Sequence, residues 1–465
     1  MRLTEYLESL KGKRVAVIGI GVSNTPLIEM LLGYGISVTA CDRKERAAFG
    51  DLGDRLEKWG CTLKLGETYL QDLDQDVIFR SPGIRPDIPE FLAAQERGSQ
   101  LTSEMEVFFE VCPCHTIAVT GSDGKTTTTT MIAELLKAAG KTVHVGGNIG
   151  HPLLAEADKM GSDDYAVLEL SSFQLLTMHK SPEIAVVTNL APNHLNVHKG
   201  MNEYVEAKAN VFLHQTADQK VILNYDNDIT RAFAPRAKGD VVFFSRRFPA
   251  HGDVFLKDDV ITVRCTDGER KVLPTKEIIL PGVHNIENYM AAIAAVDGIV
   301  SDEIICAIAA SFSGVEHRIE LVREFEGVKY YNDSIASSPT RTIAGLRSFR
   351  QKVILIAGGK DKDIPYDALG PEIIEHVKLL ILTGGDVFGS TVPKICASVL
   401  NAPGYSQETT PMLFIDDFKQ AAQTAAQHAK PGDIVLMSPA STSFDKFSNF
   451  MERGNVFKTV VKQLH

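Results

Sequence analysis

Residues 116–127 read Thr116-Ile-Ala-Val-Thr-Gly121-Ser-Asp-Gly124-Lys125-Thr126-Thr127. The β-branched run predicts a strand, the two glycines predict a tight turn, and the threonines after Lys125 predict the start of a helix. This order is typical of a phosphate-binding loop, in which backbone N–H groups and the helix N-terminus face phosphate oxygens. The lysine would neutralise the outer phosphates, and the Thr126 hydroxyl would be available to Mg²⁺. A glycine turn without a ligand is the alternative.

Strand, turn and amphipathic helix recur in this order on both sides of the loop, which predicts an α/β fold with parallel sheets. A helix is expected over 26–33 and another over about 285–300, and the alternation over 253–273 predicts a small antiparallel addition. The pattern indicates three α/β domains in series. Strands are predicted at 14–18, 37–41, 76–79, 116–120, 142–145, 165–170, 184–189, 220–224, 328–332, 352–357, 379–382, 412–415 and 434–437.

Composition excludes several classes of protein. A chain of 465 residues exceeds the size of one core, and its longest apolar runs, such as 377–382, are too short to span a bilayer. The N-terminus lacks the apolar core of an export signal, so a cytoplasmic location is expected. A net charge of −11 argues against nucleic acid as a partner. Seven scattered cysteines predict free thiols, with a redox role for Cys112 and Cys114 as the alternative.

Several polar residues follow the next strands of the central region. The strand at 165–170 places Glu169 at its carboxyl end, where ligands of open α/β sheets bind, so Glu169 is a candidate Mg²⁺ ligand or else a solvated capping residue. Further on, His194 is a candidate metal ligand, while His198 is expected to be structural or solvated. Lys208 lies within a predicted helix over 204–212, and spacing alone predicts a surface lysine.

The N-terminal region contains half of a dinucleotide-binding fingerprint. Gly19-Ile-Gly21-Val-Ser23-Asn24 follows a strand, and Asp42 ends the next strand about twenty residues later. The third glycine is missing, which disfavours a nicotinamide enzyme. A nucleotide-like ligand and a turn required only for packing both remain open.

Together these segments resemble the Mur ligases of peptidoglycan synthesis over nearly the whole chain. Family-level motifs are residues 121–127, 147–150, the Glu169 segment, 193–194, Lys208, 284–288 and 317–318. The branch that adds D-glutamate is indicated by 331–334, by 358–362 and, most specifically, by 438–457.

The resemblance implies an ATP-dependent ligase that phosphorylates the L-alanyl carboxylate of UDP-N-acetylmuramoyl-L-alanine and joins it to D-glutamate. It implies ATP and one or two Mg²⁺ ions as cofactors, and we expect a monomer. The implied domains are a Rossmann-like UDP-substrate domain over 1–104, a P-loop ATP-binding domain over 105–314, and a Rossmann-like amino-acid-binding domain over 315–465.

The resemblance also assigns roles to individual residues. It makes Lys125, His194 and Lys208 catalytic, and it gives one Mg²⁺ to Thr126 and Glu169 and a second to His194 and a carbamylated Lys208. The implied ATP contacts are Gly121, Ser122, Asp123, Gly124, Lys125, Thr126, Thr127, Asn285, Asn288, Arg318 and Asp333. The implied UDP-substrate contacts are Gly21, Ser23, Asp42, Arg43, Ser81, Gly83, Asn148, Ser171 and Gln174. The implied D-glutamate contacts are Ser337, Lys362, Ser443, Phe444 and Phe450.

The chain departs from the family pattern at three positions. Ile335 stands where many members have lysine, Ser337 where a threonine often contacts the amino acid, and Asp123 where the loop often has asparagine. The alternatives are another ligase of the superfamily, including one that polyglutamylates folate, a nicotinamide-dependent oxidoreductase, and a non-catalytic nucleotide-regulated binding protein.

Overall fold

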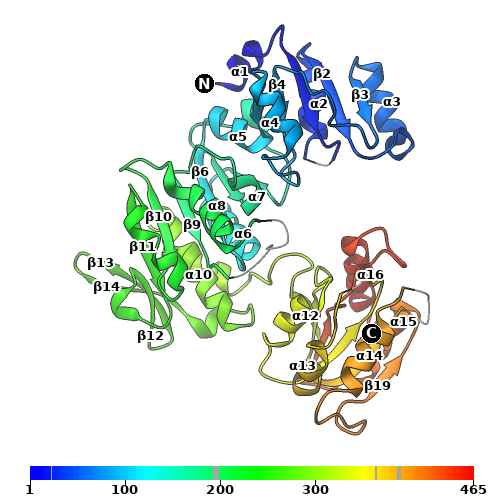
Figure 1. Ribbon diagram of the computed structural model, residues 1–465. Coiled ribbons are helices and arrows are strands. Elements are labelled where there is room, and N and C mark those ends of the chain that lie inside the picture. Colours follow the sequence, from blue (N-terminus) through cyan, green and yellow to red (C-terminus); the bar gives the residue numbers. More distant parts are fainter. Residues whose placement is uncertain (22, 192–197, 362–363, 385–388, 465) are drawn as a thin grey trace. The chain divides into compact units, whose positions relative to one another are not determined.

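The computed structural model describes residues 1–21, 23–191, 198–361, 364–384 and 389–464. The chain forms two compact units, one of residues 1–277 with 286–308 and one of residues 278–285 with 309–465. The first unit contains two sheets and the second contains one (Figure 1). The predicted α/β class with largely parallel sheets is confirmed, whereas the domain boundaries at 104/105 and 314/315 stay a prediction.

The first sheet has the strand order β3-β2-β1-β4-β5, and all its pairs are parallel. The order reverses at β1, so the loops that follow β1 and β4 lie side by side at the carboxyl edge, where such folds bind ligands. Its strands are β1 (Arg14–Ile18), β2 (Ser37–Asp42), β3 (Thr62–Leu65), β4 (Val77–Phe79) and β5 (Gln100–Thr102), and its helices are α1 (Leu3–Ser9), α2 (Thr25–Gly33), α3 (Gly50–Lys58), α4 (Pro89–Glu96) and α5 (Glu104–Val111).

The second sheet has nine strands in the order β14-β13-β12-β11-β10-β9-β6-β8-β7. Strand β6 lies between β8 and β9, so the glycine turn that follows it is at the switch point of the parallel part. The predicted antiparallel addition is confirmed as β12 to β14. The strands are β6 (His115–Thr120), β7 (Val143–Gly147), β8 (Tyr165–Glu169), β9 (Ile184–Val187), β10 (Lys220–Asn224), β11 (Asp240–Ser245), β12 (Val254–Lys257), β13 (Val260–Cys265) and β14 (Gly268–Pro274). The helices are α6 (Lys125–Ala138), α7 (Ser172–Leu175), α8 (Met201–Leu213), α9 (Asp228–Arg231), α10 (Val283–Val296) and α11 (Asp302–Ala309).

The third sheet has the order β15-β16-β20-β17-β18-β19, in which only β15 is antiparallel to its neighbour among the described strands. The strands are β15 (Glu320–Phe325), β16 (Val328–Asn332), β17 (Val353–Ala357), β18 (Val377–Leu382), β19 (Met412–Phe414) and β20 (Ile434–Met437). The helices are α12 (Pro339–Leu346), α13 (Leu369–His376), α14 (Val392–Leu400), α15 (Phe418–His428) and α16 (Phe450–Lys462).

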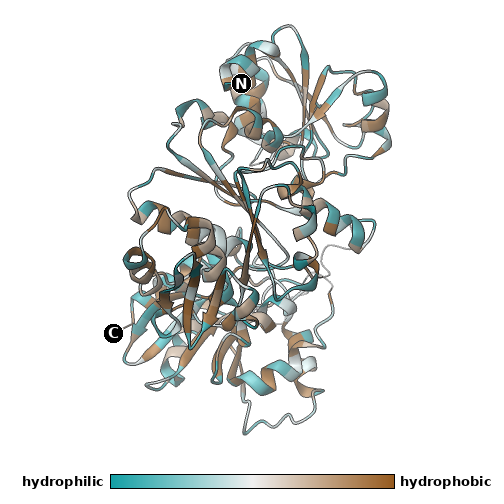
Figure 2. Cartoon of the chain, turned by 90° about the vertical axis from the view of Figure 1, so that its left-hand side faces the viewer, coloured by the Kyte–Doolittle hydropathy of each residue, from teal (hydrophilic) through white to brown (hydrophobic). Residues whose placement is uncertain are grey.

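The central strands are largely apolar because both faces of each parallel sheet are covered. In β17, Val353 and Leu355 belong to the core on one face, while Ile354 and Ile356 belong to the core on the other. Several central strands are coloured as hydrophobic, and many helices carry hydrophilic residues on one side (Figure 2).

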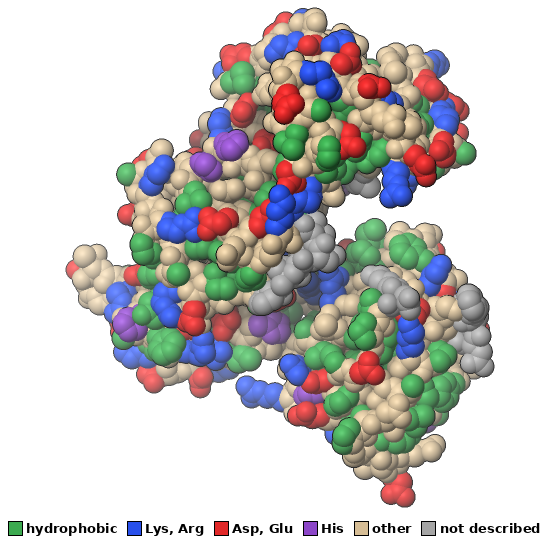
Figure 3. Space-filling model, in the orientation of Figure 1, with side chains coloured by type: hydrophobic (Ala, Val, Ile, Leu, Met, Phe, Trp, Pro, Cys, Tyr) green, Lys and Arg blue, Asp and Glu red, His purple; other side chains and the backbone are tan. Residues whose placement is uncertain are grey.

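The hydropathy of the helices, the charged surface residues and the state of the cysteines agree with what the composition predicts. Within the described residues, no helix combines the length and hydropathy required to cross a membrane. Lys and Arg side chains are mixed with Asp and Glu side chains on the face drawn in Figure 3. All seven cysteines are free thiols, as predicted. The Sγ atoms of Cys112 and Cys114 lie 3.2 Å apart, and a redox role for them stays a hypothesis.

Candidate active site

The glycine turn between β6 and α6 has the backbone that a phosphate loop requires. Gly121 and Gly124 have φ angles of +146° and +79°, in the left-handed region that favours glycine. The Asn288 amide of α10 lies so close to Gly124 that a β-carbon there would overlap its Oδ1 atom. Thr128 Oγ1 donates to the same Oδ1 atom over 3.3 Å. The Asn288 side chain of α10 therefore packs against the turn, and a side chain at position 124 would disrupt this contact.

Lys125 is the first residue of α6, and its side chain folds back over the turn. Its Nζ donates to the carbonyl oxygens of Gly121 and Ser122 at 3.0 and 2.9 Å. The ammonium group and the positive end of the helix dipole thus lie on the same side of the turn. This arrangement concentrates positive charge where the outer phosphates of a bound nucleotide would lie.

Thr126, Glu169 and Asn148 meet beside the turn. Strands β6 and β8 are parallel neighbours with Val119 opposite Glu169, so Glu169 ends its strand next to the glycine turn. Thr126 Oγ1 donates to Glu169 Oε2 at 2.6 Å, and Asn148 Nδ2 donates to Glu169 Oε1 at 2.7 Å. A hydroxyl and a carboxylate are hard oxygen donors that suit Mg²⁺, which usually takes few protein ligands and completes its shell with phosphate and water. No cluster of three or more His, Cys, Asp or Glu side chains suited to a metal occurs among the described residues.

Lys208 is buried, with 1% of its surface exposed, so the surface position predicted from spacing is wrong. The reason is tertiary: α8 packs against β6 and β9 and is buried on more than one side. Lys208 Nζ donates to Thr120 Oγ1 at 2.8 Å and lies 5.6 Å from the centre of the Tyr204 ring. Burial first, and then the positive charge of Lys125, hold the pKa of Lys208 well below its ordinary value. The lowered pKa favours the neutral form of the amine.

Thr120 and Tyr204 are site residues that the sequence analysis missed. Thr120 Oγ1 also donates to the Leu170 carbonyl at 2.7 Å, so one hydroxyl joins β6, the end of β8 and Lys208. The Tyr204 hydroxyl lies 2.9 Å from Ser122 Oγ in the turn. The only sequence signal for Thr120 is its position directly before the first glycine.

Two predicted site residues lie outside the described residues: His194, with its neighbour Asn193, and Lys362. His198 is described and is buried. Its ring nitrogens lie 2.9 Å from Ser172 Oγ and 3.2 Å from Glu203 Oε2, and burial lowers its pKa. His198 therefore holds the structural position that was one of its two predicted roles.

The residues predicted for the UDP end cluster at the carboxyl edge of the first sheet. Asp42 Oδ2 accepts a hydrogen bond from Ile20 N at 2.8 Å, so the carboxylate shapes the turn after β1. Ser81, which follows β4, lies directly against Gly19 in that turn. Gly21, Ser23, Arg43 and Gly83 are exposed at the same edge.

Ser171 and Gln174, also predicted for the UDP substrate, form the capping box of α7. Ser171 Oγ accepts from Gln174 N at 3.2 Å, and Gln174 Oε1 accepts from Ser171 N at 3.0 Å. They follow Glu169 directly, so the structure brings them, with Asn148, to the carboxyl end of β8.

In the second unit, Asp333 follows β16 and is fully buried. Its Oδ2 accepts from Ser438 Oγ, which follows β20, at 2.7 Å, and its Oδ1 accepts from Ile319 N at 3.3 Å. Burial raises the pKa of Asp333 to about 7, against the opposing effects of the Ser438 hydrogen bond and the Arg318 charge. Asp333 and Arg318 are thus electrostatically coupled. Asn285, which belongs to this unit, is buried, and its side-chain amide donates to the Pro281 carbonyl at 2.6 Å.

Three of the residues predicted for D-glutamate, Ser443, Phe444 and Phe450, lie between the end of β20 and the first residue of α16. Ser443 is buried, and its carbonyl accepts from the amides of Lys446 and Phe447 at 3.2 and 2.9 Å, whereas Phe444 is 63% exposed. The Phe450 carbonyl accepts from Ser334 Oγ at 2.7 Å. Ser337 follows Ser334 by three residues.

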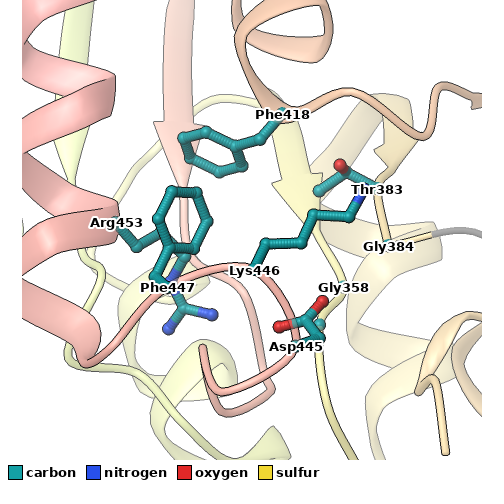
Figure 4. Close-up of a pocket in the computed structure, with 9 residues that line it drawn as sticks. Gly358, Thr383, Gly384, Phe418, Asp445, Lys446, Phe447 and Arg453 are labelled. Carbon is teal, nitrogen blue, oxygen red and sulfur yellow. The ribbon is translucent and has the colours of Figure 1, made fainter.

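Arg453, to which sequence reasoning gave no role, organises this segment. Its buried guanidinium donates to Ser334 Oγ at 3.0 Å and to the carbonyls of Ser334, Ser441 and Thr442 at 2.8, 3.1 and 3.0 Å. A small hollow with a cavity volume of about 10 Å³ lies next to it (Figure 4). This volume holds about one water molecule. It is lined by Gly358, Gly359, Thr383, Gly384, Phe418, Asp445, Lys446, Phe447 and Arg453.

Two protein-family models match consecutive parts of the chain. The model of the Mur ligase middle domain matches residues 119–296, and that of the Mur ligase glutamate ligase domain matches residues 317–441. Curated proteins named UDP-N-acetylmuramoylalanine–D-glutamate ligase are similar over almost their whole length. The one from Acetivibrio thermocellus is 52% identical, covering 100% of this chain and 99% of that protein, and the one from Ruminiclostridium cellulolyticum is 48% identical with the same coverage.

Solved structures support the fold independently. The UDP-N-acetylmuramate–alanine ligase of Thermotoga maritima superposes with a TM-score of 0.57 at 18% identity, covering 97% of this chain and 99% of that one. A UDP-N-acetylmuramoyl-L-alanyl-D-glutamate–2,6-diaminopimelate ligase superposes with a TM-score of 0.56 at 20% identity, covering 97% and 92%. With both family models matched in order and relatives about half identical over the full chain, this protein belongs to the Mur ligase family.

Proposed function

We propose that this protein is an ATP-dependent ligase that joins D-glutamate to UDP-N-acetylmuramoyl-L-alanine in the synthesis of peptidoglycan precursors. One observation carries the proposal. The glycine turn, Lys125, the Thr126–Glu169 pair and the buried Lys208 lie together at the carboxyl edge of the second sheet. The relatives that are about half identical bear this activity in their names.

A carboxylate is a poor electrophile, so amide formation needs a better leaving group. In the proposed reaction, an oxygen of the L-alanyl carboxylate attacks the γ-phosphorus of ATP, ADP leaves, and an acyl phosphate forms. The amine of D-glutamate then attacks the acyl carbon, and inorganic phosphate leaves from the tetrahedral intermediate. Transfer between two anions requires neutralised charge, and Lys125 together with the N–H groups of the glycine turn supplies it at the outer phosphates.

Thr126 and Glu169 would hold Mg²⁺, since their oxygens are already 2.6 Å apart beside the turn. The bound ion would neutralise charge on the transferred phosphoryl group. We assign a second ion to His194 and Lys208, the latter as a carbamate. A neutral lysine amine can attack CO₂, forming an N–C bond and releasing a proton, and the lowered pKa of Lys208 favours the neutral amine. The product would be a carboxylate-like ligand in place of a cation.

The remaining assignments place the substrates along the chain. The turn after β1, Asp42, Arg43 and the loop at Ser81 and Gly83 would bind the uridine end, and Asn148, Ser171 and Gln174 would lie nearer the reacting carboxylate. Asn285, Asn288, Arg318 and Asp333 would contact the adenosine of ATP. Ser337, Lys362, Ser443, Phe444 and Phe450 would bind D-glutamate. We further propose a cytoplasmic monomer.

Phosphate release tests the function directly. ATP, Mg²⁺ and the purified protein should release phosphate only when UDP-N-acetylmuramoyl-L-alanine and D-glutamate are both present, and omission of either should stop it. A panel with L-alanine, a diamino acid, a dipeptide and a folate substrate separates the other ligases of the superfamily. Phosphate release with one of these and none with D-glutamate would reject the proposed specificity.

A further inference from the structure

The Ser81–Ile84 loop follows β4 of the first sheet, and its flanking residues connect it to α7 and α8 of the same unit. The loop makes a tight turn in which Ile84 N donates to the Ser81 carbonyl at 3.1 Å, and Ser81 lies against Gly19 in the turn after β1. It therefore contacts the segment proposed for the uridine end. Two arginines flank it in sequence, Arg80 and Arg85, and both reach beyond the first sheet.

Arg80 is buried, with 1% of its surface exposed. Its Nη1 donates to the carbonyls of Ser81, Pro82 and Ile84 at 3.3, 3.3 and 2.7 Å, so the guanidinium fills the inside of the loop. Its Nη2 donates to the Phe173 carbonyl at 3.2 Å and to Thr177 Oγ1 at 3.1 Å, on and after α7. All five acceptors are neutral oxygens. Burying a charged group costs free energy. The buried Arg80 guanidinium uses its two terminal nitrogens, Nη1 and Nη2, to join the loop to α7.

Arg85 ties the other end of the loop to α8. Its Nη1 and Nη2 donate to the two carboxylate oxygens of Glu203 at 2.9 and 2.8 Å, and Asp87 accepts from the same guanidinium at 2.8 Å. The Arg85 and Glu203 side chains are only 22% and 23% exposed. A bidentate pair of this kind fixes orientation as well as distance. Glu203 lies in the first turn of α8, the helix that carries Lys208.

The two connections converge at the start of α7. Glu203 lies 3.2 Å from His198 Nδ1, and His198 Nε2 lies 2.9 Å from Ser172 Oγ. The His198 ring stacks on Phe173, whose carbonyl accepts from Arg80, with ring centres 5.2 Å apart. The loop, α7 and α8 are therefore each in contact with the other two, next to Ser171 and Gln174.

We propose that Arg80 and Arg85 are positioning residues, which hold the Ser81–Ile84 loop in register with α7 and α8 so that the UDP-linked substrate meets the site with its carboxylate in place. The inference rests on the proposed function. Neither arginine touches the reacting atoms. A substrate that spans both sheets of this unit can react only if its two ends are held at a fixed separation, and small displacements at a reacting centre have large effects on rate.

The test compares Arg80→Lys and Arg85→Ala with Arg236→Ala. Arg236 makes a bidentate pair with Glu206, which lies on α8 as Glu203 does, at 2.9 and 2.7 Å. This pair does not reach the Ser81–Ile84 loop. A lysine at position 80 keeps the charge but cannot hold both the loop and α7. We expect both test variants to lower kcat/KM for UDP-N-acetylmuramoyl-L-alanine by about tenfold or more, with KM for ATP and D-glutamate unchanged. Arg85→Lys should recover part of the loss, and Arg236→Ala should behave as wild type.

The outcomes separate this inference from the function on which it rests. A wild-type protein that releases no phosphate with both substrates would reject the proposed function. An active wild type whose Arg80→Lys and Arg85→Ala variants keep its kcat/KM for the UDP-linked substrate would reject the positioning role. Equal changes in KM for all three substrates, or the same change in Arg236→Ala, would indicate a general structural effect and would also reject it. Should Arg80→Lys fail to fold, the less buried Arg85 pair decides the matter alone.

Discussion

Asp333→Asn should change how the stability of the protein depends on pH. Burial raises the pKa of the Asp333 carboxyl from 3.8 to about 7. A carboxyl whose pKa is raised by folding binds its proton more tightly in the folded state. Its stabilising contribution is therefore complete below about pH 4 and is lost as the pH rises through about 7. A shift of about 3 pKa units corresponds to about 4 kcal/mol of unfolding free energy, of which about 2–3 kcal/mol is lost between pH 5 and pH 8.

Urea unfolding, followed by circular dichroism at pH 5 and pH 8, measures this effect. The asparagine variant cannot titrate, so its stability relative to wild type should increase by about 2–3 kcal/mol between the two pH values. Any constant cost of the amide, such as a poorer bond to Ser438, cancels in this comparison. Glu324→Gln, which removes an exposed carboxylate of the same unit, is the control. A wild type and variant that differ equally at both pH values would refute the reasoning.

Three further predictions concern the phosphate loop and its surroundings. Lys125→Ala should lower kcat for phosphate release by about a hundredfold or more because charge at the outer phosphates is lost, and retained turnover would contradict that role. Lys208→Ala should lose activity that bicarbonate or a short carboxylic acid partly restores, whereas full activity would make Lys208 a bystander. Glu169→Gln should raise the Mg²⁺ concentration for half-maximal activity by about tenfold or more, and an unchanged Mg²⁺ titration would remove Glu169 from the metal site.

Strands buried on both faces were predictable because their sequences are continuous apolar runs. The predicted bounds of β1, β10, β16 and β20 agree with the structure to the residue. Strands β3, β5 and β15 were not predicted, because they are short or partly exposed strands at sheet edges and lack a continuous apolar run. Strand β11 was missed although its run of Val and Phe carried the signal.

From periodicity and spacing alone, the site was predictable where it is local in sequence and not where it depends on tertiary packing. The glycine turn follows from a dozen consecutive residues. The contact between Thr126 and Glu169 required knowing that β6 and β8 are neighbours, and the burial of Lys208 required knowing which side of α8 faces the sheet. Likewise, the bond between Asp333 and Ser438 joins residues 105 positions apart, which no periodicity reveals.

Transfer of labelled oxygen tests the central claim most directly. The UDP-linked substrate is prepared with ¹⁸O in both oxygens of its L-alanyl carboxylate and is turned over with unlabelled ATP and D-glutamate. If the carboxylate is activated as an acyl phosphate, each released phosphate carries one ¹⁸O atom and the new amide keeps the other. Mass spectrometry that finds the amide with one ¹⁸O atom but only unlabelled phosphate, the second ¹⁸O atom having left as water, would contradict the account.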